Sequence, residues 1–228
     1  MNVALLNCSP NPDRTRENFF RIFDAVETAE IDAEDYRLED GSFPDADAID
    51  GGVISGSRYG VYDDEPFIGR LREWIQDAEL PLLGVCYGHQ AIADAYGGTV
   101  VELDEGELGF CTVEHENDPL FEGVPETFTT WQSHGDGVVE PPAEAEIIAE
   151  NEVTVQAMRI DGNVTVQFHP EIDAEYGREI VESVAENGDR SSDELDEIRA
   201  NITDENDRAA AEVHAIFDNF FERVAKHR

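Results

Sequence analysis

Cys86 lies between two glycines, in the stretch GVCYG of residues 84–88. An apolar run of strand length, residues 82–85, precedes the cysteine, and a helix-compatible run, residues 90–96, follows it. This spacing is typical of a nucleophile elbow, in which a buried strand turns sharply into a helix and leaves no room for a Cβ two residues before or after the nucleophile. We therefore predict that Cys86 is a nucleophile, activated at the positive end of the following helix, rather than a buried core thiol.

A nucleophilic thiol needs a base, and the base needs a group that orients it. His169 is the best candidate among the six histidines, because it stands just past the apolar strand 164–168, which Pro170 ends. In an extended segment His169 and Glu171 lie on the same side of the chain. The carboxylate can then select the imidazole tautomer and support the imidazolium that forms on proton transfer.

No chemistry is assigned to the two other cysteines or to His89, His214 and His227. Cys8 and Cys111 are far apart in the sequence and form no Cys-x-x-Cys pair, so neither a disulfide framework nor a zinc site is predicted. His89, on the first turn of the helix, is expected to point away from the nucleophile and pack, and His214 and His227 are expected on the surface. We expect no metal and no cofactor.

The charge balance of the chain is extreme. Its 228 residues include 53 Asp and Glu against 15 Lys and Arg, a formal net charge of -38. The acid is spread among apolar positions, which favours a solvated shell suited to very high salt, as in halophilic proteins, over a nucleic-acid mimic or cation-binding surface. Nucleic-acid binding is excluded because no basic face exists. No apolar run approaches membrane-spanning length, so we expect a soluble cytoplasmic protein with no membrane partner.

The first part of the chain alternates strand and helix patterns. Apolar runs predict strands over 3–6, 35–38, 53–55 and 82–85, and helical periodicity predicts helices over 17–28, 66–78 and 90–96. Such alternation predicts an α/β fold with a mainly parallel central sheet flanked by helices. Reactive groups collect beyond the carboxyl ends of the strands in such sheets, which is where Cys86 stands.

From residue 99 the pattern changes to short strands, followed by helices. Strands are predicted over 99–101, 108–113, 128–131, 145–149, 153–158 and 164–168, which indicates a mixed or antiparallel extension of the sheet. Helices are predicted over 175–184, 193–202 and 207–224, with a polar break over 186–192. We therefore expect a domain of residues 1–185 and a C-terminal helical extension, 186–228, packed on that same domain.

The stretches GVCYGHQ (84–90) and FHPE (168–171) together resemble the class I glutamine amidotransferase family, over about residues 1–185. The resemblance implies hydrolysis of the side-chain amide of L-glutamine through a γ-glutamyl thioester, with release of ammonia. It implies that Cys86 is the nucleophile, His169 the base and then the acid, and Glu171 the orienting carboxylate. Gln90 matches a position that contacts the glutamine substrate.

Members of this family also have a Gly-rich loop after the third strand, which here is ISGSRYG, residues 54–60. One backbone N–H of that loop joins the N–H of the residue after the nucleophile to form an oxyanion hole. The resemblance therefore implies Ser57 and Tyr87 as the two donors, with Gly56 as a substrate contact. Ser57 and Arg58 replace the Gly and Pro of the common form of this loop.

The stretch WQSHGD, residues 131–136, is similar to a segment of GMP synthetase amidotransferase domains and their free-standing relatives. There the segment supplies main-chain contacts to the α-amino and α-carboxyl groups of glutamine. The resemblance implies substrate-binding roles for Ser133, His134, Gly135 and Asp136. A simple exit from a strand into a turn would suit the glycines of this stretch as well.

No phosphate-binding loop with a lysine is present, since Lys226 is the only lysine, and a synthetase domain would need well over a hundred further residues. We therefore expect a separate chain, a synthetase, as the acceptor of the ammonia. Two alternatives remain open: a self-sufficient hydrolase of another γ-glutamyl compound, and a regulatory protein that keeps the fold without turnover.

Overall fold

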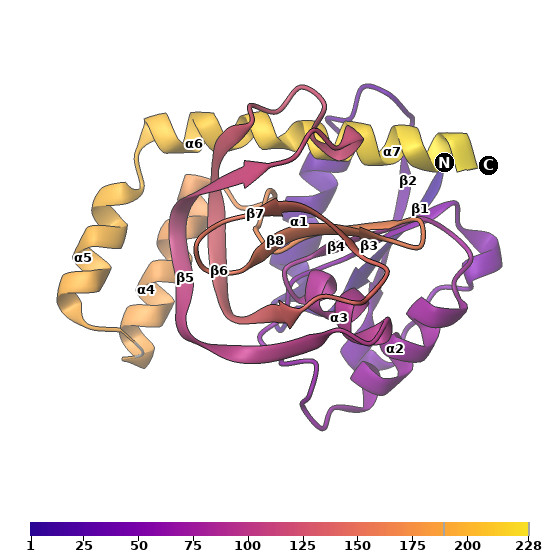
Figure 1. Cartoon of the computed structure of the whole chain (residues 1–228), viewed down its shortest axis with the longest axis horizontal. Coiled ribbons are helices and arrows are strands. Elements are labelled where there is room, and N and C mark those ends of the chain that lie inside the picture. Colours follow the sequence, from indigo (N-terminus) through magenta and orange to yellow (C-terminus); the bar gives the residue numbers. More distant parts are fainter. Residues whose placement is uncertain (189, 228) are drawn as a thin grey trace.

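The fold is built on one nine-stranded sheet, here described from a computed structural model of residues 1–188 and 190–227 (Figure 1). Its strand order is β2-β1-β3-β4-β9-β8-β7-β5-β6. The parallel part consists of β1 (Asn2–Asn7), β2 (Asp32–Arg37), β3 (Gly51–Ile54), β4 (Leu82–Val85) and β9 (Asn163–Val166). The predicted α/β fold, with a mainly parallel centre and an antiparallel extension, is confirmed.

Helices cover both faces of the parallel part. Helix α1 (Pro12–Phe23) packs on one face, and α2 (Pro66–Asp77) with α3 (Tyr87–Ala95) packs on the other. Successive strand side chains point to opposite faces, so Leu5 joins the α1 side of the core and Leu6 joins the α2 side. Burial on both faces explains why β1, β3, β4 and β9 read as mainly apolar runs in the sequence, whereas β2, at the edge of the sheet, does not.

The antiparallel part consists of β5 (Thr99–His115), β6 (Thr127–Glu140), β7 (Glu146–Glu150) and β8 (Val155–Ile160). The strands predicted over 99–101 and 108–113 are one strand, whose register with β6 shifts between Glu102 and Glu107. The irregular segment contains the polar residues between 102 and 107, which is why the sequence pattern indicated two strands in place of one. Strand β6 continues to Glu140, so it is longer than the strand predicted over 128–131. Residues 131–136, for which an exit into a turn was the alternative, lie within that strand.

Two helix predictions differ markedly from the structure in their bounds. Helix α1 begins at Pro12 and ends at Phe23, five residues earlier at each end than predicted, because proline is well placed in a first helical turn. The single helix predicted over 207–224 is divided into α6 (Asp204–Ala210), a 3₁₀ turn (Ala211–His214) and α7 (Ala215–His227). Further 3₁₀ turns span Leu38–Asp40, Ala46–Ala48 and Pro119–Phe121, the last labelled η3.

The C-terminal helices pack on the same sheet. Helices α4 (Ala174–Asn187) and α5 (Ser192–Asn201) lie beside β5 and β6 with α6, and α7 runs along the top of Figure 1. The ring of Phe217 on α7 meets that of Phe19 on α1 edge-on, with centroids 6.3 Å apart. The predicted boundary after residue 185 falls inside the last turn of α4. Asp189, in the predicted polar break, and Arg228 lie outside the described residues.

Across residues 1–188 and 190–227, no helix combines the length and the apolar character needed to cross a bilayer.

Candidate functional site

Cys86 occupies a strained turn between β4 and α3. Its backbone has φ 51° and ψ −102°, a positive-φ conformation that side chains other than glycine rarely adopt. A Cβ on Gly84 would lie 2.4 Å from the carbonyl oxygen of Gly88, and a Cβ on Gly88 would lie 2.4 Å from that of Ile54. Both glycines are therefore sterically required, as the sequence pattern predicted, and they hold the cysteine at the start of the helix.

His169 and Glu171 follow β9, the strand paired directly with β4. The N–H of His169 donates to the carbonyl oxygen of Trp131 on β6 at 2.8 Å, which ties the segment to the antiparallel part of the sheet. Its Nδ1 lies 2.8 Å from Oε1 of Glu171, and its ring and the Cys86 side chain both lie against Gly56, close enough for Cys86 to shift the pKa of His169. Cys86, His169 and Glu171 are 3%, 8% and 4% exposed, so their interactions are largely shielded from water.

The electrostatics of this group favour a charged imidazole. Burial by itself lowers the pKa of His169, but the charges of Glu171 and of Cys86, with the hydrogen bonds to both, raise that pKa well above its ordinary value. Because Nδ1 faces Glu171, Nε2 is left to face the sulfur. The arrangement can hold a thiolate beside an imidazolium, the state in which a cysteine attacks.

The two other cysteines lie in environments that keep their thiols protonated. Burial raises the pKa of Cys8 strongly, and burial with the charge of Glu107 raises the pKa of Cys111 to about 12. Cys8, Cys86 and Cys111 are all free thiols. Of these cysteines only Cys86 has an imidazole partner, so the structure singles it out chemically.

The Gly-rich loop after β3 runs directly against the Cys–His pair. A Cβ on Gly56 would lie 2.7 Å from Cε1 of His169 and 3.6 Å from Cβ of Cys86. The hydroxyl of Ser55 holds the loop, since it accepts from the N–H of Cys8 at 2.9 Å and donates to the carbonyl of Gly56 at 3.0 Å. A residue with a side chain at position 56 would displace the imidazole.

A cavity of about 220 Å³ opens beside the sulfur. Six predicted site residues besides Cys86 line it, together with two neighbours, Arg58 and Tyr59: they are Ser57, Gln90, Ser133, His134, Gly135 and Asp136. The carbonyl of Ser133 is 3.9 Å from the Cys86 sulfur. Tyr87 is the first residue of α3, where a backbone N–H has no acceptor within the helix, but its side chain is buried away from the cavity against Phe67. The structure thus brings together residues from β3, β4, α3 and β6.

The sequence analysis missed Glu107, a buried carboxylate behind the β6 wall of the cavity. Its Oε2 lies 3.0 Å from Nε2 of His134, while Nδ1 of His134 lies 2.9 Å from the carbonyl oxygen of Asp136. Both ring nitrogens therefore face oxygen atoms of the protein, which fixes the orientation of the His134 imidazole. Glu107 also accepts from the side-chain amides of Asn151 at 2.8 Å and Gln156 at 2.9 Å.

Gln90 belongs to the same hydrogen-bonded wall. Its side-chain amide donates to the carbonyl oxygen of Asp136 at 3.1 Å and to Oε1 of Gln167 at 3.2 Å. Gln90 was predicted as a substrate contact, and here its amide nitrogen is engaged with the protein. Its position on the first turn of α3 places it at the cavity, beside Cys86.

Tyr62 is a second residue that sequence reasoning did not assign to the site. Its side chain is 58% exposed, and its hydroxyl donates to the carboxylate of Asp136 at 3.1 Å. Burial and the nearby carboxylates of Glu102 and Asp63 raise the pKa of Asp136, although the Tyr62 hydrogen bond opposes the shift. Tyr62 therefore lies over the outer edge of the cavity.

The histidines outside the site were predicted with mixed success. His89 packs, as expected: it is fully buried, its Nδ1 lies 2.8 Å from the hydroxyl of Thr165, and burial lowers its pKa to about 3. His227 is exposed, also as expected. His214 was predicted on the surface but is half-buried, because the turn between α6 and α7 packs it against Pro170.

Among the described residues, no group of three or more His, Cys, Asp or Glu side chains is arranged to hold a metal ion.

Comparison with known proteins identifies the family. The family profile described as "Glutamine amidotransferase class-I" matches residues 18–185. A GMP synthase (glutamine-hydrolyzing) of Thermotoga sp. (strain RQ2) is 39% identical over 140 residues, which are 60% of this chain and 27% of the relative. The corresponding protein of Porphyromonas gingivalis is 41% identical over 133 residues, 56% of this chain and 26% of the relative. The alignments thus span about a quarter of the length of these relatives.

Solved structures of similar size share the fold. A glutamine amidotransferase from Thermotoga maritima superposes with a TM-score of 0.79 at 21% identity, covering 97% of this chain and 98% of that one. A glutamine amidotransferase from Methylobacillus flagellatus gives a TM-score of 0.77 at 21% identity, covering 100% and 94%. With the profile match over most of its length, the chain belongs to the class I glutamine amidotransferase family.

Proposed function

We propose that this protein hydrolyses the side-chain amide of L-glutamine to glutamate and ammonia, with Cys86, His169 and Glu171 as its catalytic residues. The observation that carries the proposal is the contact of the Cys86 thiol with a buried imidazole whose other nitrogen lies 2.8 Å from Glu171. The order nucleophile, base and orienting carboxylate is the one that cysteine-dependent acyl transfer requires.

The reaction would proceed in two halves. The Cys86 thiolate attacks the amide carbon of glutamine, and the His169 imidazolium gives its proton to the leaving nitrogen, which departs as ammonia. The neutral imidazole then takes a proton from water, whose oxygen attacks the thioester carbon. The sulfur leaves as a thiolate beside the imidazolium just formed, which restores the Cys86–His169 pair, and the new γ-carboxyl group gives its proton to solvent as glutamate departs. Glu171 stabilises the imidazolium each time it forms.

Two backbone N–H groups would stabilise the oxyanion that develops on the amide oxygen. We assign them to Ser57, which lines the cavity, and to Tyr87, whose N–H is free of an intrahelical acceptor as the first residue of α3. Loss of one such donor typically costs about 3 kcal/mol of transition-state stabilisation. Gly56 would leave the space in which the substrate amide approaches the sulfur.

The β6 wall would bind the amino-acid end of the substrate. Ser133, His134, Gly135 and Asp136 line the cavity, and the side-chain amide of Gln90 donates to the carbonyl of Asp136. The cavity, at about 220 Å³, is smaller than the roughly 300–1,000 Å³ typical of drug-sized ligands. Its size therefore favours free glutamine over a larger γ-glutamyl compound.

A synthetase on a separate chain would accept the ammonia, and a GMP synthetase-like partner is the first candidate. Support comes from the relatives named GMP synthase (glutamine-hydrolyzing), of which the alignment spans about a quarter. The remaining part of those relatives has no counterpart in this alignment. An ammonia-using synthetase would supply the complementary chemistry.

Ammonia release from glutamine tests the hydrolysis directly. Wild type and Cys86→Ala are assayed in molar potassium chloride, with Cys111→Ala as the matched control, and Cys86 is labelled with a chloroketone analogue of glutamine. We expect activity and labelling in wild type and Cys111→Ala, and neither in Cys86→Ala. Ammonia release by Cys86→Ala, or failure of the analogue to label wild type, would refute the proposal.

The acceptor is tested by adding a GMP synthetase that lacks its own glutaminase part. Stimulated ammonia release, and GMP formed from glutamine in place of ammonium, would support the pairing. Release from other γ-glutamyl compounds but not from glutamine would indicate the self-sufficient hydrolase. Binding of glutamine without turnover would indicate the regulatory alternative.

A further inference from the structure

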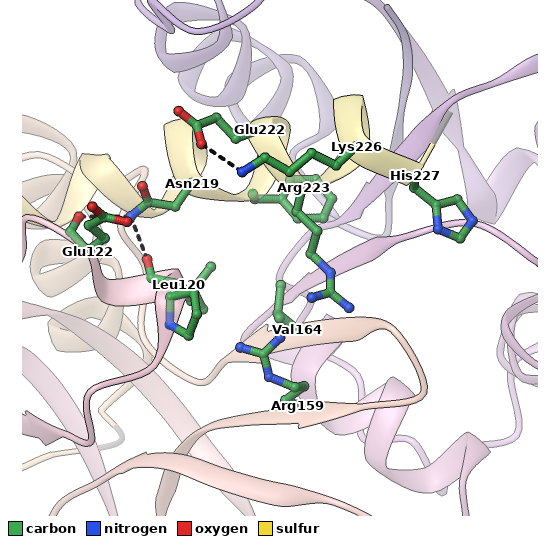
Figure 2. A pocket seen from close by; sticks show the side chains of 11 residues that line it. Leu120, Glu122, Arg159, Val164, Asn219, Glu222, Arg223, Lys226 and His227 are labelled. Carbon is green, nitrogen blue, oxygen red and sulfur yellow. Dashed lines mark hydrogen bonds and ion pairs between the residues drawn. The ribbon is translucent and has the colours of Figure 1, made fainter.

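A second cavity, of about 380 Å³, lies beneath the C-terminal helix α7 and away from Cys86 (Figure 2). It is bounded by α7, by the 3₁₀ turn η3, and by β8 and β9. Its apolar side includes Leu120, Val164 and Phe220, and its basic side includes Arg159, Arg223, Lys226 and His227. The cavity is larger than the one beside Cys86 and is not part of the proposed catalytic site.

The basic residues of this cavity are unusual in so acidic a chain. The protein has only 15 Lys and Arg against 53 Asp and Glu, and three of the fifteen, Lys226 among them as the sole lysine, line this one cavity. The charges come from two elements far apart in sequence, since Arg159 belongs to β8 and Arg223 to α7. Tertiary folding therefore concentrates positive charge that the sequence leaves dispersed.

Arg223 binds a backbone carbonyl rather than a carboxylate. Its Nε and Nη2 donate to the carbonyl oxygen of Gly162 at 3.1 and 2.9 Å, and within residues 1–188 and 190–227 no carboxylate forms an ion pair with it. Burial, and the positive charge of Arg159, lower the pKa of Arg223, and the negative charge of Asp118 offsets this only in part. In Figure 2 the two guanidinium groups extend toward one another from α7 and β8. Like charges facing each other in a partly buried space are stabilised by an anion between them.

The acidic residues at the cavity include Glu122 and Glu222 in its lining, and Asp118 and Glu146, which pair with Arg159. Asp118 binds Nε and Nη2 of Arg159, and Glu222 lies 3.2 Å from the ammonium of Lys226. Among the described residues no acceptor bonds Nη1 of either Arg159 or Arg223. Each guanidinium therefore keeps a donor for a ligand, and the two donors come from opposite sides of the cavity.

We propose that this cavity binds the phosphate group of a small phosphorylated molecule between Arg159 and Arg223. A phosphate carries close to two negative charges and several acceptor oxygens, which suits two guanidinium groups that converge on it. A carboxylate would neutralise only one of them. The apolar side formed by Leu120, Val164 and Phe220 leaves room for an organic body attached to the phosphate.

Calorimetric titration of the full chain with inorganic phosphate and with phenyl phosphate, at one fixed potassium chloride concentration, tests the site. We expect saturable binding, weakened about tenfold or more in Arg223→Gln, because a charge-assisted contact is lost. Arg70→Gln is the matched control: Arg70 also donates to a backbone carbonyl, that of Gly41 at 2.9 Å, but lies outside the cavity. The Arg70→Gln variant should bind both phosphates with the affinity of wild type.

A second variant keeps the test independent of folding damage. Glu222→Gln removes a negative charge from the cavity and frees Lys226, so it should bind phosphate more tightly than wild type. Tighter binding of phenyl phosphate than of inorganic phosphate indicates an organic phosphate, and equal binding indicates free phosphate. Absence of saturable binding in wild type, unchanged affinity in Arg223→Gln, or an equal loss in Arg70→Gln overturns the proposal.

Discussion

Nε2 of His134 lies 3.0 Å from Oε2 of Glu107, and both side chains are buried behind the wall of the Cys86 cavity. Because Nδ1 of His134 donates to the carbonyl oxygen of Asp136, this pair fixes the same carbonyl that Gln90 holds from the other side. Removal of one partner from such a buried contact leaves the other without its hydrogen bond. Glu107 thus positions the carbonyl of Asp136 through His134, although it does not line the cavity itself.

Substitution Glu107→Gln should raise the KM for glutamine about tenfold with a smaller effect on kcat. The amide oxygen is a weaker acceptor than the carboxylate, so His134 and, through it, the carbonyl of Asp136 are no longer held where the substrate binds. A weakened buried hydrogen bond should also lower the free energy of unfolding by roughly 1–3 kcal/mol. Steady-state kinetics and urea unfolding measure both. Glu105→Gln, exposed on the same strand, is the control, and an unchanged KM in Glu107→Gln would contradict the role.

Substitution Glu171→Gln should lower kcat more than it changes KM and should move the alkaline limb of the kcat/KM profile to lower pH. The carboxylate stabilises protonated His169 and, with Cys86, holds its pKa above the ordinary value against the effect of burial. Its removal lowers that pKa, so the imidazolium is lost at a lower pH. The measurement is kcat/KM against pH, with exposed Glu175→Gln as control. A limb that stays in place would refute the orienting role.

Iodoacetamide at neutral pH should alkylate Cys86 well before Cys8 or Cys111. The thiolate is the reactive form, and burial raises the pKa of both other cysteines, that of Cys111 to about 12. Peptide mass spectrometry after short exposure gives the rate at each cysteine. Cys86→Ala should show almost no early modification, and rapid alkylation of Cys111 in either protein would contradict the prediction.

Substitution Gly56→Ala should lower kcat by about a hundredfold with the protein still folded. The added Cβ would lie 2.7 Å from Cε1 of His169, so the ring must move away from Cys86. A displacement of about 1 Å in a catalytic group costs about two orders of magnitude in rate. Gly69→Ala in helix α2 is the matched control, since its Cβ would meet nothing within 4 Å. Kinetics and thermal unfolding of both variants measure the effect. Full activity in Gly56→Ala would contradict the close packing.

The free energy of unfolding should rise with potassium chloride concentration. A net charge of -38 repels itself in the compact state, and salt screens that repulsion over a Debye length of about 3 Å at 1 M. Chemical unfolding at several fixed salt concentrations provides the measurement. A protein dominated by attractive surface ion pairs would instead lose stability, and such a result would contradict the proposed adaptation to high salt.

Local patterns predicted the parallel part of the fold well. Strand 82–85 was predicted with its exact bounds, because a short apolar run between Pro81 and the glycine elbow allows few alternatives. The sequence pattern divided strand β5 into two predicted strands and made strand β6 too short. Their polar residues do not alternate regularly with apolar ones, because the register between the two strands shifts along their length. The break between α6 and α7 was missed because the apolar residues on either side of the 3₁₀ turn keep the spacing of a continuous helix.

The sequence by itself determined the elbow at Cys86 and the His169–Glu171 spacing, because steric demands on glycine and the side-chain period of an extended chain act over a few residues. Only the tertiary structure decided that Glu107 supports His134, that Tyr62 reaches Asp136, and that Arg159 faces Arg223. Among 53 acidic residues nothing local distinguishes Glu107. Contacts between distant segments depend on strand order and register, which only the folded sheet establishes.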